Sequence, residues 1–167
     1  DFEEQETVFV GPNNSGKTSA TTVFRCFLSS RDFKIHDFSM QKIVEIDRYV
    51  PGQEEQIFPS ISLDLWFNFD PESIAFGRAF SLLSSVSLET NVVGIRCAFE
   101  VENLTNLWTE YSSIFPTDAN GDRARSLSYF LSLDGNLKRH FTTQYSSLEQ
   151  LENDDVEATV LKPAEGK

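Results

Sequence analysis

The chain has 167 residues, of which 40% are apolar and 15 are Phe, and its formal net charge is −12 at pH 7. A chain of this length folds as one domain that buries about two thirds of its unfolded surface, so the composition excludes an intrinsically disordered segment. Its negative charge would repel DNA phosphates, so this segment is not expected to be the main nucleic-acid-binding surface. An acidic surface that aids solubility explains the charge more simply. The sequence shows no signal peptide and no apolar run near the ~18 residues of a membrane helix, so we expect no membrane contact and a cytoplasmic location.

The first recognisable unit begins with a short apolar run, Thr-Val-Phe-Val at 7–10, which has the character of a buried strand. Residues 11–18, Gly-Pro-Asn-Asn-Ser-Gly-Lys-Thr, then match the phosphate-loop template G-x-x-x-x-G-K-[ST] at every fixed position. A helix is predicted from there to about residue 30, because apolar side chains recur with the spacing of one helical face. Strand, glycine-rich loop and helix in this order predict a nucleotide-phosphate site. The apolar helix positions are Ala20, Val23, Phe24, Phe27 and Leu28.

The residue types of this loop suit a bound triphosphate. Backbone N–H groups at a helix N-terminus neutralise phosphate charge, and Gly11 and Gly16 would let the chain approach closely in unusual backbone conformations. We expect Lys17 to reach the β- and γ-phosphates as the catalytic cation, Thr18 to ligate Mg²⁺ and Ser19 to bind the α-phosphate. No guanine-reading Asn-Lys-x-Asp motif is present, which favours ATP by default. The expected ATP-binding residues are Gly11, Pro12, Asn13, Asn14, Ser15, Gly16, Lys17, Thr18 and Ser19.

The next thirty residues have little periodicity. Residues 43–46, Ile-Val-Glu-Ile, are predicted to form a short strand, and the Pro-Gly pair at 51–52 predicts a turn. His36 stands beside Asp37, a pair that could serve acid–base chemistry, but a surface histidine in a loop is the more economical interpretation.

The hydrophobic period then changes to two. Apolar and polar residues alternate over 61–69 and again over 93–101, which predicts two strands with one face in the core. Residues 74–83 between them are predicted to be helical, and residues 104–115 fit a helix or a strand equally well.

The last part of the chain is predicted to contain a hairpin. Residues 116–121 form a loop, and the alternating runs 127–133 and 137–145 flank Asp-Gly-Asn at 134–136, a turn signal. Several strands joined without long helices predict an antiparallel or mixed sheet.

Two cysteines lie in apolar stretches, Cys26 in the first helix and Cys97 in the second alternating strand. Buried free thiols fit these positions better than a disulfide, which agrees with a reducing compartment. With two His in the chain and no Cys-x-x-Cys motif, we expect no zinc site.

The loop closely resembles the Walker A sequence of ABC-type ATPase heads in the SMC, RecF and Rad-like group, which carry Asn at the place of Asn13. The doublet Asn13-Asn14 is most similar to the OLD (overcoming lysogenization defect) family of ATP-dependent endonucleases. An Asp-Phe pair after the first helix, here Asp37-Phe38, and the alternating strand at 61–69 resemble that family too. The resemblance is specific over residues 7–30 and is one of pattern over 31–150.

This resemblance implies an α/β fold: a P-loop NTPase of ABC/SMC type, in which a mixed sheet with a largely antiparallel β subdomain packs around the P-loop helix. We expect an N-terminal lobe at 1–150, with the loop and helix at 7–30 and a β-rich region at 43–147, followed by an acidic, poorly ordered tail at 151–167. ABC-type heads also have a Walker B Asp-Glu pair and a signature loop, and the sequence shows neither. We therefore expect an incomplete ATPase head.

The resemblance also implies partners for the whole protein. ATP would drive homodimerisation through the heads, and the protein would act on DNA in repair or anti-phage defence, with any endonuclease site far downstream. Hydrolysis by this chain alone is expected to be slow or absent. ABC-type heads place a Gln near the γ-phosphate, and Gln53 and Gln56 are the candidates here.

Two other functions remain open from the sequence. A small-molecule or nucleotide kinase would need an Arg-rich lid, for which Arg123 and Arg125 form the only close pair of arginines. A non-enzymatic nucleotide-sensing module, in which ATP orders a surface for a partner, fits the same residues and differs only in what the rest of the protein does.

Overall fold

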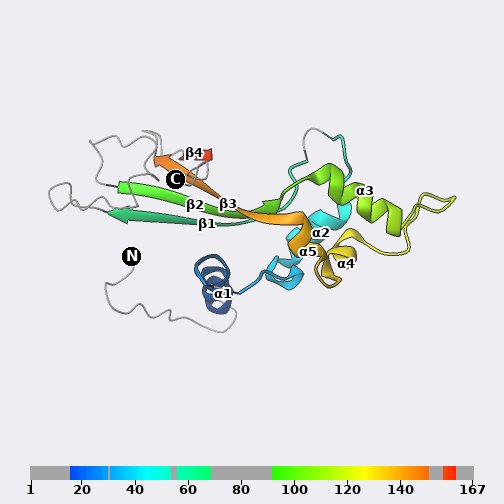
Figure 1. Cartoon of the computed structure of the whole chain (residues 1–167), viewed down its shortest axis with the longest axis horizontal. Helices are drawn as coiled ribbons and strands as arrows, with labels where there is room; N and C mark the ends of the chain where they lie inside the picture. Colours follow the sequence, from blue (N-terminus) through cyan, green and yellow to red (C-terminus); the bar gives the residue numbers. More distant parts are fainter. Residues whose placement is uncertain (1–15, 30, 54–55, 69–91, 151–155, 161–167) are drawn as a thin grey trace, which may run out of the picture.

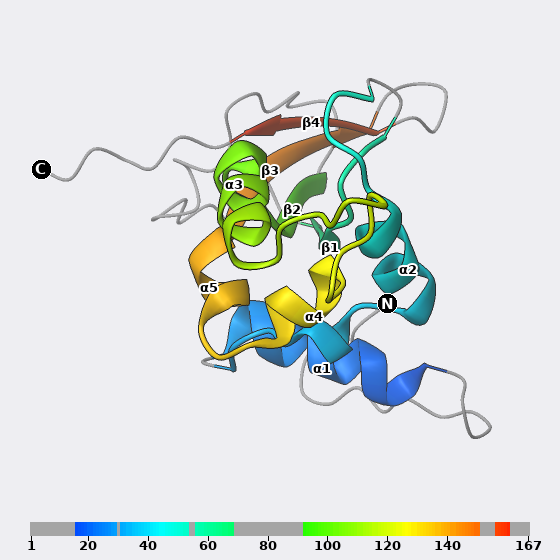
Figure 2. The ribbon, with the colours of Figure 1, turned by 90° about the vertical axis from the view of Figure 1, so that its right-hand side faces the viewer.

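The computed structural model describes residues 16–29, 31–53, 56–68, 92–150 and 156–160 (Figure 1). The strands form one sheet, helices gather at one end of it, and the first helix lies against one face (Figure 1). Figure 2 looks onto the helical end, with the third and second helices on opposite sides of it. In chain order the elements are α1 (Lys17–Leu28), the 3-10 turn η1 (Ile35–Asp37), α2 (Met40–Arg48), β1 (Ile61–Asn68), β2 (Val92–Val101), α3 (Leu104–Ile114), α4 (Leu127–Ser132), α5 (Asn136–His140), β3 (Phe141–Gln150) and β4 (Val156–Val160).

The sheet is an antiparallel meander of order β1-β2-β3-β4. The alternating runs at 61–69 and 93–101 are indeed strands, and they pair with Leu63 opposite Cys97 and Asp64 opposite Arg96. Neighbouring pairs therefore face opposite sides of the sheet: Cys97 is buried, whereas the Arg96 guanidinium forms two hydrogen bonds of 2.7 Å with the Asp64 carboxylate on the other face.

Gly94 is the point at which the sheet admits a large aromatic ring. It lies opposite Trp66 on β1 and Leu148 on β3. A Cβ atom at this position would lie 2.5 Å from Trp66 Cζ3 and 2.7 Å from Leu148 Cβ. A side chain on β2 would thus occupy the space that the indole fills, and only glycine lets Trp66 lie flat across the strand.

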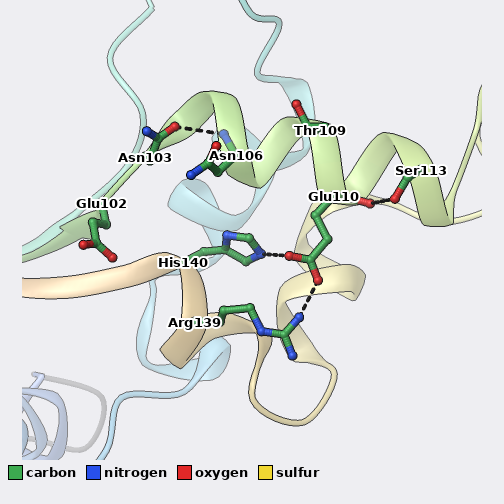
Figure 3. Close-up of a pocket in the computed structure, with 8 residues that line it drawn as sticks. All are labelled: Glu102, Asn103, Asn106, Thr109, Glu110, Ser113, Arg139 and His140. Atoms are coloured by element: carbon green, nitrogen blue, oxygen red, sulfur yellow. Dashed lines mark hydrogen bonds and ion pairs between the residues drawn. The ribbon is translucent and has the colours of Figure 1, made fainter.

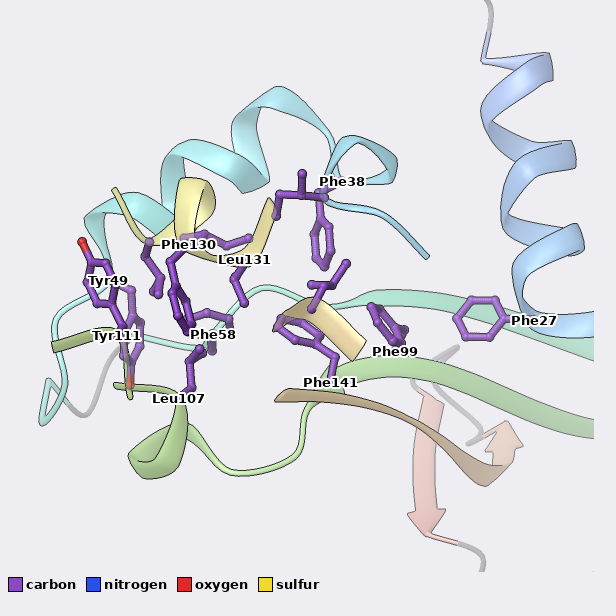
Figure 4. Packing of buried hydrophobic residues seen from close by; sticks show 14 of the residues in the cluster. Phe27, Phe38, Tyr49, Phe58, Phe99, Leu107, Tyr111, Phe130, Leu131 and Phe141 are labelled. Atoms are coloured by element: carbon purple, nitrogen blue, oxygen red, sulfur yellow. The ribbon is translucent and has the colours of Figure 1, made fainter. Parts of the chain in front are cut away.

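The predicted helix after the phosphate loop is confirmed as α1, which lies against β1. Its buried residue Phe27 packs edge-on against Phe33, with ring centroids 4.9 Å apart, and Phe33 stacks on Phe99 of β2 at 4.4 Å. Phe99 in turn stacks on Phe141 of β3 at 5.1 Å (Figure 4). This row of aromatic rings joins α1 to the sheet and leads into the core of the helical end.

At the helical end the core is closed by α2, α3 and α4 (Figure 4). Tyr111 of α3 donates a 2.7 Å hydrogen bond to the Arg125 carbonyl, which fixes the chain that leads into α4. The apolar side chains of these helices pack together in the core, and such packing supplies most of the stabilisation of short helices. The largest fully buried side chains are Phe130, Ile46, Leu107, Leu127 and Leu131.

The strand predicted at 43–46 is wrong, because these residues lie in α2. In a strand Val44 and Ile46 would share a face, but Ile46 is fully buried and Val44 is 42% exposed. Ser39 caps the helix by accepting a hydrogen bond from the Lys42 backbone N–H at 3.3 Å. The ambiguous stretch 104–115 is likewise helical and forms α3.

The predicted hairpin is also wrong in its first strand. Leu127, Phe130 and Leu131 are buried with the i, i+3, i+4 spacing of α4, whereas Tyr129 and Leu133, which a strand would have buried with Leu127, are exposed. Gly135, in the left-handed region at φ 82°, starts the short helix α5 instead of a hairpin turn. The second strand begins only at Phe141 and continues to Gln150 as β3.

The loop predicted at 116–121 is confirmed, with an isolated bridge between Thr117 and Arg123. Residues 156–160, in the tail expected to fray, form β4 instead, paired with β3. The helix predicted at 74–83, the strand at 7–10 and the rest of the tail lie outside the described residues. None of the helices in the described ranges has the length and apolar character needed to cross a bilayer.

Candidate functional site

The described part of the phosphate loop begins at Gly16, the residue that caps α1. Gly16 is in the left-handed region at φ 82° and ψ 3°, the kind of unusual conformation predicted for it. Among the described residues nothing lies within 4 Å of the place that a Cβ atom would take, so the backbone conformation favours glycine here. The Gly16 carbonyl accepts the first helical hydrogen bond, from Ala20 N at 2.9 Å. Helix α1 thus starts immediately after the last glycine of the motif.

The first turn of α1 has the properties of an anion-binding end. It carries no acidic side chain, and no side-chain cap bonds its N–H groups in the described structure. Thr18 and Ser19 are both exposed there, and the Thr18 carbonyl accepts a 3.0 Å hydrogen bond from the Thr21 hydroxyl. Uncapped N–H groups and the positive end of the helix dipole favour a bound anion at this position. Residues 11–15 lie outside the described residues, as does the Lys17 side chain.

A comparison with protein families bears directly on this helix start. The family model described as an AAA ATPase domain matches residues 1–163. The chain belongs to this family. The mixed α/β architecture with its small antiparallel sheet fits a P-loop NTPase, and the family implies nucleotide binding by an ATPase. Neither the curated proteins nor the solved structures gave a match.

The Asp37-Phe38 pair has a structural position in this ATPase domain. The Asp37 carboxylate accepts hydrogen bonds from the Arg31 guanidinium at 3.0 Å and from the Lys34 backbone N–H at 2.8 Å. Phe38 is buried and packs edge-on against Phe141, with ring centroids 5.8 Å apart. The pair therefore fixes the segment that leads from α1 to α2.

Other polar candidates from the sequence take no part in a described site. His36 is exposed, in agreement with a surface histidine. The Gln56 side-chain carbonyl accepts a 3.0 Å hydrogen bond from the Val50 N–H, so it closes the turn after α2, and Gln53 is exposed. In the described ranges no group of three His, Cys, Asp or Glu side chains could hold a metal ion.

The two cysteines are free thiols, as predicted, with Cys97 buried and Cys26 half-buried. Burial raises the pKa of both thiols, and for Cys97 the nearby Asp64 carboxylate raises the pKa further. A thiol with a raised pKa is a poor nucleophile at neutral pH. Neither thiol therefore has the lowered pKa of an activated cysteine nucleophile.

A second candidate site is a cleft of about 700 Å³ between α3 and the junction of α5 with β3 (Figure 3). At its centre the Glu110 carboxylate faces two basic side chains: the Arg139 guanidinium donates to one oxygen, and His140 Nε2 lies 3.0 Å from the other. Sequence reasoning missed this cleft because it predicted residues 137–145 as a strand and left 104–115 undecided. The lining residues are Glu102, Asn103, Asn106, Thr109, Glu110, Ser113, Arg139 and His140.

His140 is the buried member of this group, with 6% of its side chain exposed. Although the Glu110 oxygen is within 3.0 Å of Nε2, it lies away from the N–H direction, and Nε2 has no aligned hydrogen-bond acceptor among the described residues. The contact is therefore electrostatic in character, and the Glu110 carboxylate is only partly engaged by the imidazole.

Proposed function

We propose that this ATPase domain binds ATP with Mg²⁺ at residues 11–19 and is the N-terminal segment of an OLD-like, ABC-type ATPase. The observation that carries the proposal is the start of α1 at Gly16, directly after a complete phosphate-loop motif, in a chain of the AAA ATPase domain family. The left-handed glycine and the uncapped first turn fit a phosphate group at the helix N-terminus. The exposed Thr18 fits a metal ligand.

Each residue of the motif then has a distinct part in binding. Gly11, Gly16 and the backbone between them would surround the phosphates, and Lys17 would neutralise the β- and γ-phosphates. Thr18 would hold Mg²⁺ through its hydroxyl, and Ser19 would bond the α-phosphate. Bound Mg²⁺ supplies charge neutralisation of the phosphates during transfer.

Hydrolysis requires groups beyond this motif. Phosphoryl transfer depends on positioning and charge stabilisation around the γ-phosphate, including a residue that orients the attacking water. We propose that downstream Walker B and signature elements, brought together by head dimerisation, supply these groups. The DNA-directed activity, whether endonuclease, repair or anti-phage defence, would then belong to the whole protein and not to this acidic segment.

The two arginines expected to form the lid of a kinase are used in packing instead. Arg123 lies 5.0 Å from the Tyr111 ring and 5.5 Å from the Trp108 ring, and it donates a 3.1 Å hydrogen bond to Ser112. Arg125 lies 4.8 Å over the Tyr129 ring. Both guanidinium groups are thus engaged in packing around α3 and α4, so neither is placed to close over a phosphate.

Calorimetric titration of ATP into the chain, first with Mg²⁺ and then with EDTA, tests the proposal. We expect magnesium-dependent binding that is lost in Lys17→Ala, because the ammonium interacts directly with the phosphates. Lys138→Ala is the matched control, since Lys138 is an exposed lysine whose ion pair with Asp32 lies on the surface.

Equal ATP affinity of Lys17→Ala and the control would contradict the phosphate site. Rapid ATP turnover by the isolated chain, abolished in Lys17→Ala, would preserve the phosphate site but contradict the requirement for downstream elements. A head-to-head dimer that forms only with ATP would support the ABC-type assignment.

A further inference from the structure

We propose that the cleft between α3 and the α5–β3 junction binds a basic segment of a partner protein, with cationic side chains on Glu110 and Glu102. This site is separate from the phosphate loop, and its assignment does not rest on ATP binding. At the base of the cleft the end of β2 is bonded to the end of α5, because the Glu102 N–H donates a 2.8 Å hydrogen bond to the His140 carbonyl. The cleft therefore has a fixed backbone floor.

Each residue that lines the cleft carries a polar group, and its carbon atoms form part of the walls as well. All eight lining residues have polar or charged side chains; Figure 3 shows Glu102 just after β2, Arg139 and His140 across from α3, and the others on α3 or at its start. Pockets for drug-like ligands or cofactors are lined mainly by apolar and aromatic side chains. The lining thus favours a hydrophilic ligand that forms hydrogen bonds over an apolar or aromatic one.

The charge of the cleft favours a cation. Glu102 and Glu110 bring two negative charges against the single positive charge of Arg139, and Glu102 has no ion pair among the described residues. An ionised carboxylate offers about four lone-pair directions, of which Arg139 takes one at Glu110. A ligand ammonium or guanidinium can use the remainder without displacing Arg139.

His140 makes Glu110 a positioned acceptor. The imidazole is more than nine-tenths buried and directed into the cleft, where it contacts the carboxylate without an aligned hydrogen bond. Buried polar groups in proteins are nearly always hydrogen-bonded. Because Nε2 itself is enclosed, a bound cation would act on it through Glu110, by drawing the carboxylate into line with the imidazole.

Two side-chain amides in the cleft favour a peptide ligand over a simple polyamine. The Asn103 side-chain carbonyl caps α3 by accepting from the Asn106 N–H at 2.9 Å, and the Asn103 side chain is exposed. Asn106 has an exposed amide one turn further along the same face. Such amides pair with peptide N–H and C=O groups, which a polyamine lacks. No described cluster suits a metal ion, so a divalent cation is not favoured.

An NMR titration of the ¹⁵N-labelled chain with a capped pentapeptide that contains one arginine and one lysine tests this inference. We expect chemical-shift changes confined to residues 102–113 and 139–140. Glu102→Gln and Glu110→Gln should each raise the peptide Kd about threefold or more, because each removes one cation–carboxylate pair. Glu45→Gln is the control, since Glu45 pairs with Lys42 on the exposed face of α2.

Glu102→Gln keeps the test decisive if Glu110→Gln disturbs folding, because Glu102 is exposed and its side chain supports no described contact. Unchanged affinity in Glu102→Gln would overturn the proposal, as would equal binding of a peptide with glutamine at both cationic positions. Chemical-shift changes at residues outside the cleft would overturn it as well. If spermidine bound with the same affinity as the peptide, the ligand class would be a polyamine and not a peptide.

Discussion

Asp47 of α2 accepts two hydrogen bonds from Ser128 in the first turn of α4: one from the backbone N–H at 2.7 Å and one from the hydroxyl at 2.9 Å. The two residues are 81 positions apart in sequence. A carboxylate at a helix N-terminus satisfies a free N–H group and interacts favourably with the helix dipole. Asp47 thus acts as a cap supplied by another helix, and it joins α2 to α4.

Substitution of Asp47 by Ala should lower the free energy of unfolding by about 1–2 kcal/mol, because α4 is short and loses both a cap and a charge interaction. Urea unfolding followed by circular dichroism measures the change. Glu45→Ala removes a carboxylate from the same helix whose ion pair in the described structure is with Lys42, and it should cost less than about 0.5 kcal/mol. Equal losses in the two variants would show that the Asp47 contact contributes nothing specific.

The sequence predicted α1, β1 and β2 because their hydrophobic periods are unambiguous. It failed at α4, where Leu127, Tyr129, Leu131 and Leu133 alternate as a strand would, while Leu127, Phe130 and Leu131 also fit a helix. Nothing local separates the two patterns. The choice is made by tertiary contacts such as the Asp47 cap and the packing of Phe130 against Tyr111, at a centroid distance of 5.8 Å.

Of the two candidate sites, one could be predicted from the sequence and the other could not. The phosphate loop is contiguous in sequence, so its motif is visible without a structure, and Gly16 has the backbone conformation that was expected. Glu110 and His140 are 30 residues apart and come together only because α3 and α5 fold against each other. No sequence pattern marks such a pair when both of its elements are assigned wrongly or left undecided.

Gly94→Ala tests the packing of Trp66 across the sheet. The new Cβ would lie 2.5 Å from the indole and 2.7 Å from Leu148 Cβ, so the ring must move. Overpacking of this kind should cost roughly 1–3 kcal/mol of stability. Trp66 is already 40% exposed, and its emission should shift further to longer wavelength as more of the ring enters water. The emission is measured in a Trp108→Phe background so that only Trp66 reports. Unchanged emission would mean that the sheet, and not the indole, adjusts.

Gly16→Ala and Gly121→Ala form a matched pair. Both glycines have positive φ, 82° and 86°, and open space around the position of a Cβ atom. Each substitution should therefore cost about 1 kcal/mol of stability through backbone strain alone. Only Gly16→Ala should weaken ATP binding, by about tenfold or more, because only Gly16 starts the proposed phosphate site. Parallel calorimetry and urea unfolding separate the two effects, and equal ATP affinity in both variants would contradict the role of Gly16.

The buried thiol of Cys97 should make stability fall at alkaline pH. Burial and the Asp64 carboxylate raise the pKa of Cys97 in the folded state, so the unfolded chain loses its thiol proton first as the pH rises. The stabilisation is complete below the ordinary thiol pKa near 9.0 and is lost as the pH rises through the folded value.

Cys97→Ala removes this dependence. At pH 7 the variant should be destabilised by roughly 1–2 kcal/mol, since it loses a buried sulfur atom. Between pH 8 and pH 10.5 the urea midpoint of the variant should decline less than that of the unmodified chain. The difference between the two urea midpoints should therefore become smaller as the pH rises. Tyr111, whose pKa is also raised by burial, keeps its own alkaline loss in both proteins, so the comparison isolates the thiol. A constant difference across this range would show that the Cys97 thiol titrates alike in the folded and unfolded states.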